Sequence, residues 1–237
     1  MTIDQALVQR LAPTGALRAV INLGNPVLAH GTPDEPGGVT VAIARELASR
    51  LEVPLTLECV DAARRSLAAL TDGTADVAFL AVEPAREVDV HFSPPYLTIE
   101  GVYVVGHDSP VTTAADVDRP GVRVGVKQGS AYDLYLTRTL QHAGVVRGAD
   151  GVAVYRESGL DVGAGIRQPL TALVAEEASL RLVEPAFMQI QQAVALPRDR
   201  GEEAADALAG FVRDLLDSGF VRRELAAAGQ DPELAAG

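Results

Sequence analysis

The sequence predicts an α/β fold made of two consecutive units, each with mostly parallel strands flanked by helices. Short apolar runs alternate with stretches of helical periodicity along the 237 residues, as expected for parallel strands joined by crossover helices. This alternation restarts after residues 107–110 (His-Asp-Ser-Pro), which divides the chain into two parts. Hydrophobic residues make up 48% of the chain, enough for a sizeable core and too many for a disordered protein.

In the first unit, residues 17–23 predict a strand that Gly24-Asn25-Pro26 ends. Between residues 39 and 51, apolar side chains recur with the spacing of one helix face. The elements expected next are a strand at 54–60, a helix at 62–70 with Asp61 as its N-cap, and strands at 77–81 and 97–105.

In the second unit, the expected elements are a helical turn at 114–117, a strand at 122–126, a helix at 131–142, a strand at 161–165, a helix at 169–178 and a strand at 180–184. A return crossing at 185–192 and a strand at 193–196 lead back to the first unit, where a C-terminal helix carries an apolar face. We therefore expect one domain of residues 1–107 plus 190–237 and another of residues 108–189, with hinges near 105–110 and 185–192.

Composition excludes several classes of function. The net charge of −12, with no basic stripe, argues against nucleic acid as a partner. Cys59 is the only cysteine, so no intrachain disulfide can form, and the four histidines show no metal-ligand spacing. We expect no metal and no cofactor.

The start of the chain, MTIDQALVQRLAPTG, lacks the basic and apolar regions of a secretory signal. No apolar run approaches the roughly 20 residues that span a bilayer, so the chain is not expected to cross a membrane. We expect a cytoplasmic protein as the sequence is written, and a periplasmic or extracellular one if a signal was trimmed.

The segment from Ala75 to Tyr96 carries the clearest functional signal. A buried strand at 77–81 is followed by a polar turn with one arginine, Arg86, and then by Phe92-Ser93-Pro94-Pro95-Tyr96. An arginine at the mouth of a hydrophobic strand is suited to binding a carboxylate, because its planar fork offers paired donors.

Four segments together resemble the type 2 periplasmic binding proteins, specifically the family 3 solute-binding proteins that serve amino-acid ABC transporters. They are Gly38–Ala44, the block from Ala75 through Tyr96, Val122–Ser130, and Leu160–Pro169 followed by Gln192–Pro197. The resemblance covers about residues 15–225, and the second block is its most specific part.

The resemblance implies a two-lobed clamp that closes on a small carboxylate-bearing solute, with the ligand cleft between the lobes. In such proteins the arginine matching Arg86 binds the solute carboxylate, assisted by groups at positions matching Ala81 and Ser130. It also implies the permease of an ABC transporter as a partner.

Two departures from the family pattern concern the solute ammonium. Glu83 stands where amino-acid binders often have threonine, and Gly165-Ile166-Arg167 occupies the region that usually supplies an acid. Either Glu83 takes over the ammonium, or Arg167 binds a second anionic group of the solute.

The remaining candidates for ligand contact each have an ordinary structural alternative. Ser130 sits where a helix begins and Asn25 in a Gly-Asn-Pro turn, so each also suits a purely local role as cap or turn residue. Tyr132 could cover the ligand or simply pack, and Gln191 lies near the return crossing with Gln192.

Binding without catalysis is the leading hypothesis, so no catalytic residue is assigned. The alternative is a dehydratase of the cyclohexadienyl type, acting on prephenate or arogenate, with Glu83 or Lys127 as general acid. A sensory module of a transcription regulator is disfavoured, since only about 16 residues precede the first strand and no DNA-reading helix-turn-helix fits there.

Overall fold

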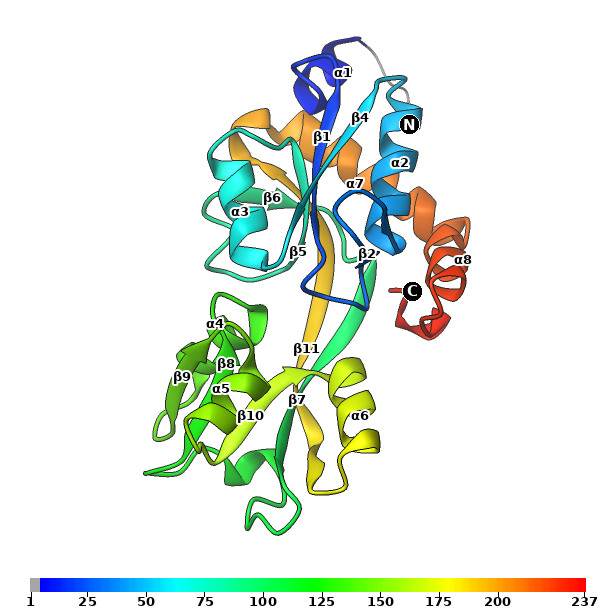
Figure 1. The fold of residues 1–237 in the computed structure, drawn as a ribbon. Coiled ribbons are helices and arrows are strands. Elements are labelled where there is room, and N and C mark those ends of the chain that lie inside the picture. The colour runs from blue at the N-terminus through cyan, green and yellow to red at the C-terminus, as the bar shows by residue number, and fades with distance from the viewer. Residues whose placement is uncertain (1–4) are drawn as a thin grey trace. The chain divides into compact units, whose positions relative to one another are not determined.

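The computed structural model describes residues 5–237, which form two compact units. Residues 1–4, which belong to the segment searched for a secretory signal, lie outside this range. The first unit holds the chain through Thr98 together with Gln191–Gly237, and the second holds Ile99–Ile190. Strands β7 (Leu97–Gly106) and β11 (Leu180–Pro197) each run from one unit into the other (Figure 1). The first division therefore falls inside a continuous strand, nine residues earlier than the sequence suggested.

The sheet of the first unit has the strand order β4-β1-β5-β11. Strand β1 (Leu17–Asn22) pairs in parallel with both β4 (Leu55–Val60) and β5 (Val77–Ala81), and β11 runs antiparallel to β5. The short strand β6 (Val90–Phe92) pairs with β11. Because β1 and β5 are parallel, the loops that follow them leave from the same edge of the sheet.

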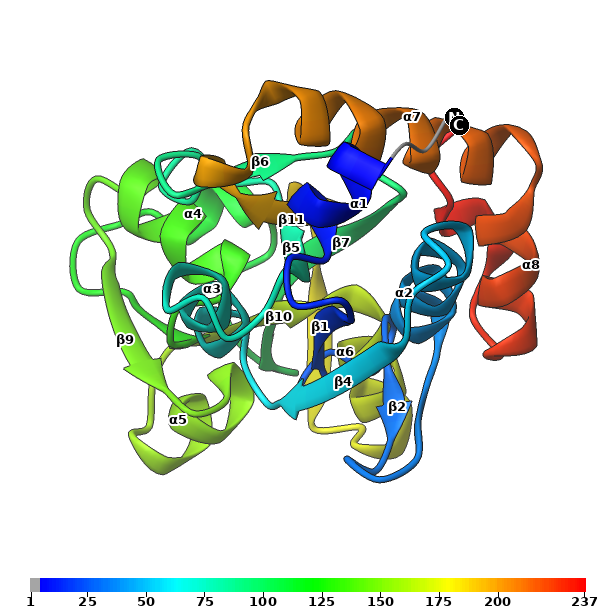
Figure 2. The same ribbon diagram turned by 90° about the horizontal axis from the view of Figure 1, so that it is seen from above.

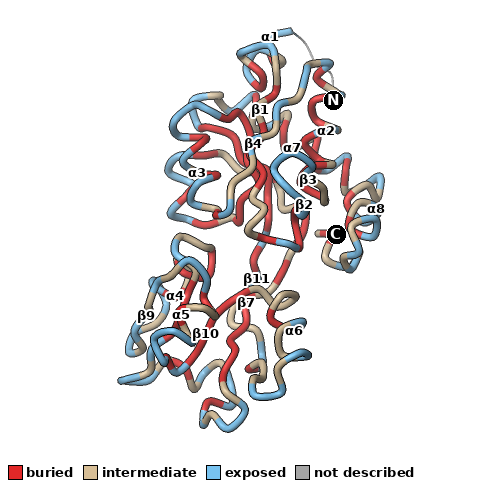
Figure 3. Tube along the Cα trace, viewed as in Figure 1, coloured by how far each residue is buried: buried red, intermediate tan, exposed pale blue. Residues whose placement is uncertain are grey.

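Helices α2 (Val39–Arg50) and α3 (Ala63–Thr71) are the crossovers between these parallel strands, and they lie on opposite sides of β1 (Figures 1 and 2). The unit also contains α1 (Gln5–Leu11), α7 (Glu202–Asp217), α8 (Phe220–Ala227), the hairpin β2–β3 (His30–Gly31 and Pro36–Gly37) and the turns η2 (Arg198–Arg200) and η3 (Pro232–Leu234). All five residues of β5 are buried, and exposed residues follow the outer faces of α3 and α8 (Figure 3).

Gly38 begins α2 in a conformation that requires glycine. Its φ is 101°, and a Cβ at this position would lie 2.6 Å from the carbonyl oxygen of Leu28. Any larger residue would therefore clash with the backbone of the loop that follows β1.

The sheet of the second unit has the order β7-β10-β8-β9. Strands β8 (Arg123–Lys127), β9 (Gly144–Gly148) and β10 (Val162–Ile166) are parallel, and β7 is antiparallel to β10. The helices are α4 (Ala131–Thr139), α5 (Gly151–Glu157) and α6 (Arg167–Glu176), preceded by the turn η1 (Ala114–Asp116). The carboxyl ends of β8 and β10 thus share one edge, and their amino ends share the other.

Several predicted elements were wrong or missing. The two strands expected at 180–184 and 193–196 are one strand, β11, because the chain stays extended through the expected crossing. Strand β9 and helix α5 were not predicted, since β9 is short and glycine-flanked, with only two apolar residues. The N-cap of α3 is Ala62, not Asp61, and it makes no side-chain cap.

Among the described residues, no helix combines the length and apolar character needed to cross a membrane.

The buried carboxylate of Asp76, the residue just before β5, binds Arg18 at the start of β1. Asp76, whose side chain is fully buried, accepts hydrogen bonds from the Arg18 backbone N–H (3.0 Å) and from the Arg18 Nε and Nη2 atoms (3.0 and 2.7 Å). Arg200 Nη2 adds a fourth bond at 3.0 Å. One carboxylate therefore neutralises part of the charge of two arginines from distant segments.

We expect Asp76→Asn to destabilise the protein by about 3 kcal/mol, because the neutral amide leaves two partly buried guanidinium groups without their counter-charge. Urea unfolding followed by circular dichroism measures the change. The control is Asp206→Asn on the exposed face of α7, where a loss within about 0.5 kcal/mol is expected. A loss at residue 76 no larger than the control's would contradict this account.

Candidate functional site

The turn after β5 places Arg86 in a nearly dry environment. The backbone N–H of Arg86 donates to the Glu83 carbonyl oxygen (2.9 Å), and the N–H of Val90 donates to the Arg86 carbonyl oxygen (3.2 Å). The guanidinium folds back so that Nη1 donates to the carbonyl oxygen of Ala81, the last residue of β5, at 2.9 Å. Only 2% of the residue is exposed, so Arg86 does not project into bulk water.

Glu83 shares this environment, with an exposure of 2%. Burial lowers the pKa of Arg86 to about 10, and the nearby Glu83 carboxylate opposes that shift. The guanidinium is still charged at neutral pH. The turn therefore holds two opposite charges, three residues apart, in surroundings where solvent screens them weakly.

Gln191 reaches this turn through its backbone rather than its side chain. Its carbonyl oxygen accepts the N–H of Val82 (2.9 Å), while its side chain is exposed. The next residue, Gln192, is buried and lies opposite Ala81 in the β5–β11 register. Side chains alternate along a strand, so the buried amide belongs to Gln192.

Asn25 leaves from the same sheet edge, after β1. Its Oδ1 atom accepts the N–H of Val27 at 3.2 Å, and its exposure is 6%. This is the local turn role that the sequence offered as the alternative. Ligand contact by Asn25 stays a prediction.

In the second unit, Ser130 is the N-cap of α4, as its position suggested. Its Oγ accepts the backbone N–H of Asp133 at 3.1 Å, and the Asp133 carboxylate accepts the N–H of Gly129 at 2.8 Å. Asp133 is buried and also pairs with Arg147 (2.9 Å). A carboxylate from the first turn of α4 thus already binds the backbone N–H of Gly129 at the start of this helix.

Tyr132 packs inside this unit. Burial raises the pKa of Tyr132 well above its ordinary value, and its hydroxyl is hydrogen-bonded to the Ser130 side chain and the Lys127 backbone. The residue is 6% exposed. This arrangement fits the packing alternative and fixes the geometry of the 127–130 loop.

Arg167 is the first residue of α6, which begins two residues earlier than the helix expected at 169–178, and two carboxylates bind its guanidinium. Its Nη1 and Nη2 atoms donate to the two Glu184 oxygens at 2.5 and 2.8 Å, and its Nε donates to Glu100. Gln189 donates to the other oxygen of Glu100 (2.8 Å). A second anionic group of a solute would therefore compete with Glu184 for the paired Nη donors of Arg167.

The model of the bacterial extracellular solute-binding proteins, family 3, matches residues 18–228. The chain belongs to this family.

Solved structures agree with the fold of this family 3 solute-binding protein. A mutant of ArgBP from T. maritima is 21% identical, covers 94% of this chain and 99% of its own, and has a TM-score of 0.75. The ABC transporter substrate-binding protein AbpA from Streptococcus pneumoniae, bound to L-arginine, is 20% identical, covers 93% and 97%, and has a TM-score of 0.76.

A third structure is the ancestral amino acid-binding protein AncCDT-1, a precursor of cyclohexadienyl dehydratase. It is 20% identical, covers 93% of this chain and 98% of its own, and has a TM-score of 0.72. No curated protein matches the sequence.

Sequence reasoning missed three acidic residues of this solute-binding protein. Asp133 could have been found, because Ser130-Ala131-Tyr132-Asp133 has the spacing of a capping box. Glu100 and Glu184 could not have been found in this way. They lie in β7 and β11, and only the folded arrangement of these strands brings them to Arg167 at the start of α6. In residues 5–237, no group of three or more His, Cys, Asp or Glu side chains could hold a metal ion.

The hydrogen bonds from Arg167 hold the pKa of Glu184 below its ordinary value of 4.5. A carboxylate with a lowered pKa stabilises the fold above pH 4.5, and this contribution disappears as the pH falls through the lowered value. We expect Arg167→Met to raise the titration midpoint of Glu184 toward 4.5 in carbon NMR of the side-chain carboxyl. Arg156→Met, which removes the separate ion pair with Glu177, should leave Glu184 unchanged. An unshifted Glu184 in the Arg167 variant would contradict the pairing.

Proposed function

We propose that this family 3 solute-binding protein binds a small zwitterionic solute, an amino acid or a close relative, through the turn that follows β5. Arg86 holds the solute carboxylate and Glu83 holds its ammonium. The observation that carries this proposal is the pair of opposite charges three residues apart, each 2% exposed, at the carboxyl end of a fully buried strand.

Arg86 suits the carboxylate for reasons of geometry and environment. A guanidinium has five N–H donors in a planar fork that matches a carboxylate, and the Ala81 carbonyl fixes its orientation through Nη1. The low exposure of Arg86 itself strengthens each charge-assisted hydrogen bond that it makes. A small anion would therefore find a donor already in place, with little side-chain entropy left to lose.

Glu83 suits the ammonium because the second unit has no acid directly after β10. Ile166 ends that strand, and Arg167, Gln168 and Pro169 follow. Arg167 is itself bound by Glu100 and Glu184, which leaves it fixed between two carboxylates. Glu83 is thus the acid best placed to distinguish an amino acid from an organic acid that lacks the amine.

The structural relatives support an amino acid as the solute, since AbpA is described as bound to L-arginine. AbpA is also the substrate-binding protein of an amino acid ABC transporter. We therefore propose the membrane part of such a transporter as the partner that receives the solute.

We expect two substitutions in the turn to separate recognition of the carboxylate from recognition of the ammonium. Arg86→Lys should weaken binding of an amino acid and of its des-amino analogue alike, by about 30-fold to 5,000-fold, because a lysine cannot form the paired bonds. Glu83→Gln should weaken only the amino acid, by roughly tenfold or more. The des-amino analogue should bind this variant about as well as the wild type, since it has no ammonium that could lose a contact with residue 83.

Isothermal titration calorimetry with the twenty amino acids and matched des-amino acids measures these affinities. Glu87→Gln, an exposed carboxylate in the same turn, is the control and should change neither. Equal losses for both ligand classes in Glu83→Gln would refute the ammonium role. Binding unchanged in Arg86→Lys would refute the whole proposal.

The dehydratase alternative depends on the same buried Glu83 acting as a proton donor. Incubation of the wild type with prephenate and arogenate tests it directly. Product that disappears in Glu83→Gln would replace binding by catalysis as the function of this turn.

A further inference from the structure

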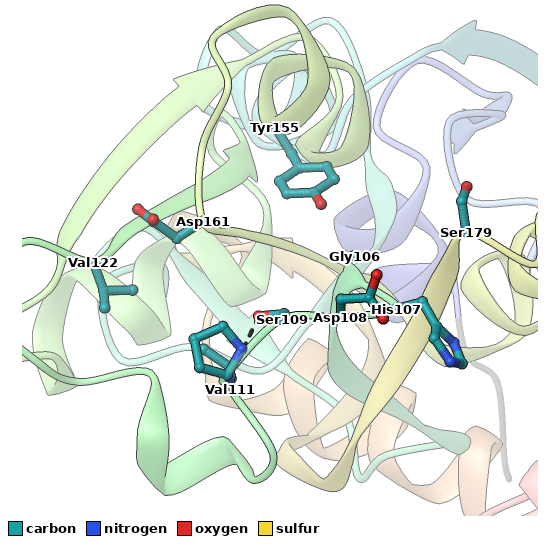
Figure 4. A pocket seen from close by; sticks show the side chains of 10 residues that line it. Gly106, His107, Asp108, Ser109, Val111, Val122, Tyr155, Asp161 and Ser179 are labelled. Atoms are coloured by element: carbon teal, nitrogen blue, oxygen red, sulfur yellow. Dashed lines mark hydrogen bonds between the residues drawn. The ribbon is translucent and has the colours of Figure 1, made fainter.

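An open pocket of about 480 Å³ lies entirely within the second unit, away from the residues considered so far (Figure 4). It is bordered by Gly106 at the end of β7, by Val122 just before β8 and by Asp161 just before β10. Strands β8 and β10 begin here, whereas Lys127–Ser130 and Arg167 lie where these strands end. The pocket is therefore at the opposite edge of this sheet from Lys127–Ser130 and Arg167.

One wall of the pocket, residues 107–111, is held in place by Arg181. Its guanidinium donates to the carbonyl oxygens of His107, Ser109 and Val111 at 3.1, 2.9 and 2.7 Å. The N–H of His107 also donates to the Ser179 carbonyl oxygen at 2.7 Å. The loop is thus preorganised, which lowers the entropy lost when a ligand binds against it.

Four polar side chains at the pocket, those of His107, Asp108, Tyr155 and Ser179, make no hydrogen bond or ion pair within the described part of the chain. The Tyr155 hydroxyl points into the pocket and the Asp108 carboxylate lies at its border (Figure 4), and neither makes a hydrogen bond or ion pair with residues 5–237. The other carboxylate, Asp161, already accepts the backbone N–H of Arg123 at 2.8 Å. Among the four side chains without a partner, Asp108 is the acidic one and Tyr155 is the one whose hydroxyl points into the pocket (Figure 4).

The polar groups that remain available at the pocket favour a cationic ligand. Arg181 is used by three carbonyl oxygens, and Arg123 donates through Nη2 to the Gly159 carbonyl oxygen (2.8 Å). Both guanidinium groups remain positively charged, but Asp108 is the charged side chain lining the pocket that makes no hydrogen bond or ion pair with residues 5–237, and the whole chain carries −12. Val111, Val122 and Pro110 add apolar surface beside it.

We propose that this pocket binds a small primary organic amine in its ammonium form. The ammonium donates to the Asp108 carboxylate and the Tyr155 hydroxyl oxygen, and the alkyl part packs on the valine and proline side chains. The volume is within the range of small-molecule sites. The pocket binds independently of the proposed solute site, since it requires no carboxylate on the ligand.

Gly106 offers a way to fill the pocket without straining the backbone. Its φ lies outside the left-handed region, and a Cβ added there would lie 3.8 Å from the Tyr155 hydroxyl oxygen, an ordinary contact. A leucine at this position would therefore occupy the space that a ligand needs.

The test uses n-butylammonium chloride as probe and 1-butanol as its neutral counterpart, with amide NMR shifts as the readout. We expect n-butylammonium to shift signals of residues 106–111 and 155, and 1-butanol to bind at least tenfold more weakly. Asp108→Asn should weaken the amine about tenfold, Gly106→Leu should abolish its binding, and Tyr155→Phe should weaken it by a smaller factor.

Glu157→Gln removes an exposed charge from the end of the same helix as Tyr155 and should leave the affinity unchanged. Glu83→Gln should also leave it unchanged, which separates this pocket from the proposed solute site. Shifts confined to the turn at 81–90, equal binding of 1-butanol, or equal effects of Asp108→Asn and Glu157→Gln would each overturn the proposal.

Discussion

The candidate site depends on one costly feature, a guanidinium almost removed from water at the end of β5. A buried charge is tolerated only when hydrogen bonds and an opposite charge compensate its desolvation. For Arg86 the Ala81 carbonyl oxygen and the nearby Glu83 do this, and the same turn is tied to β11 through Val82 and Gln191. The short polar turn therefore has a defined shape, and its charge cannot move without loss of stability.

The second unit satisfies its charges internally and in a different way. Arg167 is held by two carboxylates, and Asp133 accepts hydrogen bonds from Gly129 and Arg147 at the start of α4. These contacts fix the loops at the carboxyl edge of β8 and β10. The charged groups that make them are already bound to other groups of the same unit. A selective contact with a zwitterion is therefore better assigned to the first unit, where Glu83 and Arg86 lie together.

Parallel strands give the second unit two chemically distinct edges. One carries Lys127–Ser130 and Arg167, while the other carries the loop at 107–111, Tyr155 and the proposed amine pocket. Loops at the two edges share few residues, so each edge can acquire a binding property of its own.

The sequence alone determined the α/β class, the alternation of β1, α2, β4, α3 and β5, and the family, because these depend on local periodicity and on the block around Arg86. It could not reveal that β11 is one strand, since an extended chain through Pro185 has no local mark. Tertiary structure decided that Arg167 meets Glu100 and Glu184, residues 67 and 17 positions away. It also decided that Asp108 and Tyr155 border one pocket. Such meetings depend on strand pairing and register, which bring together side chains whose distance along the chain carries no information about their contact.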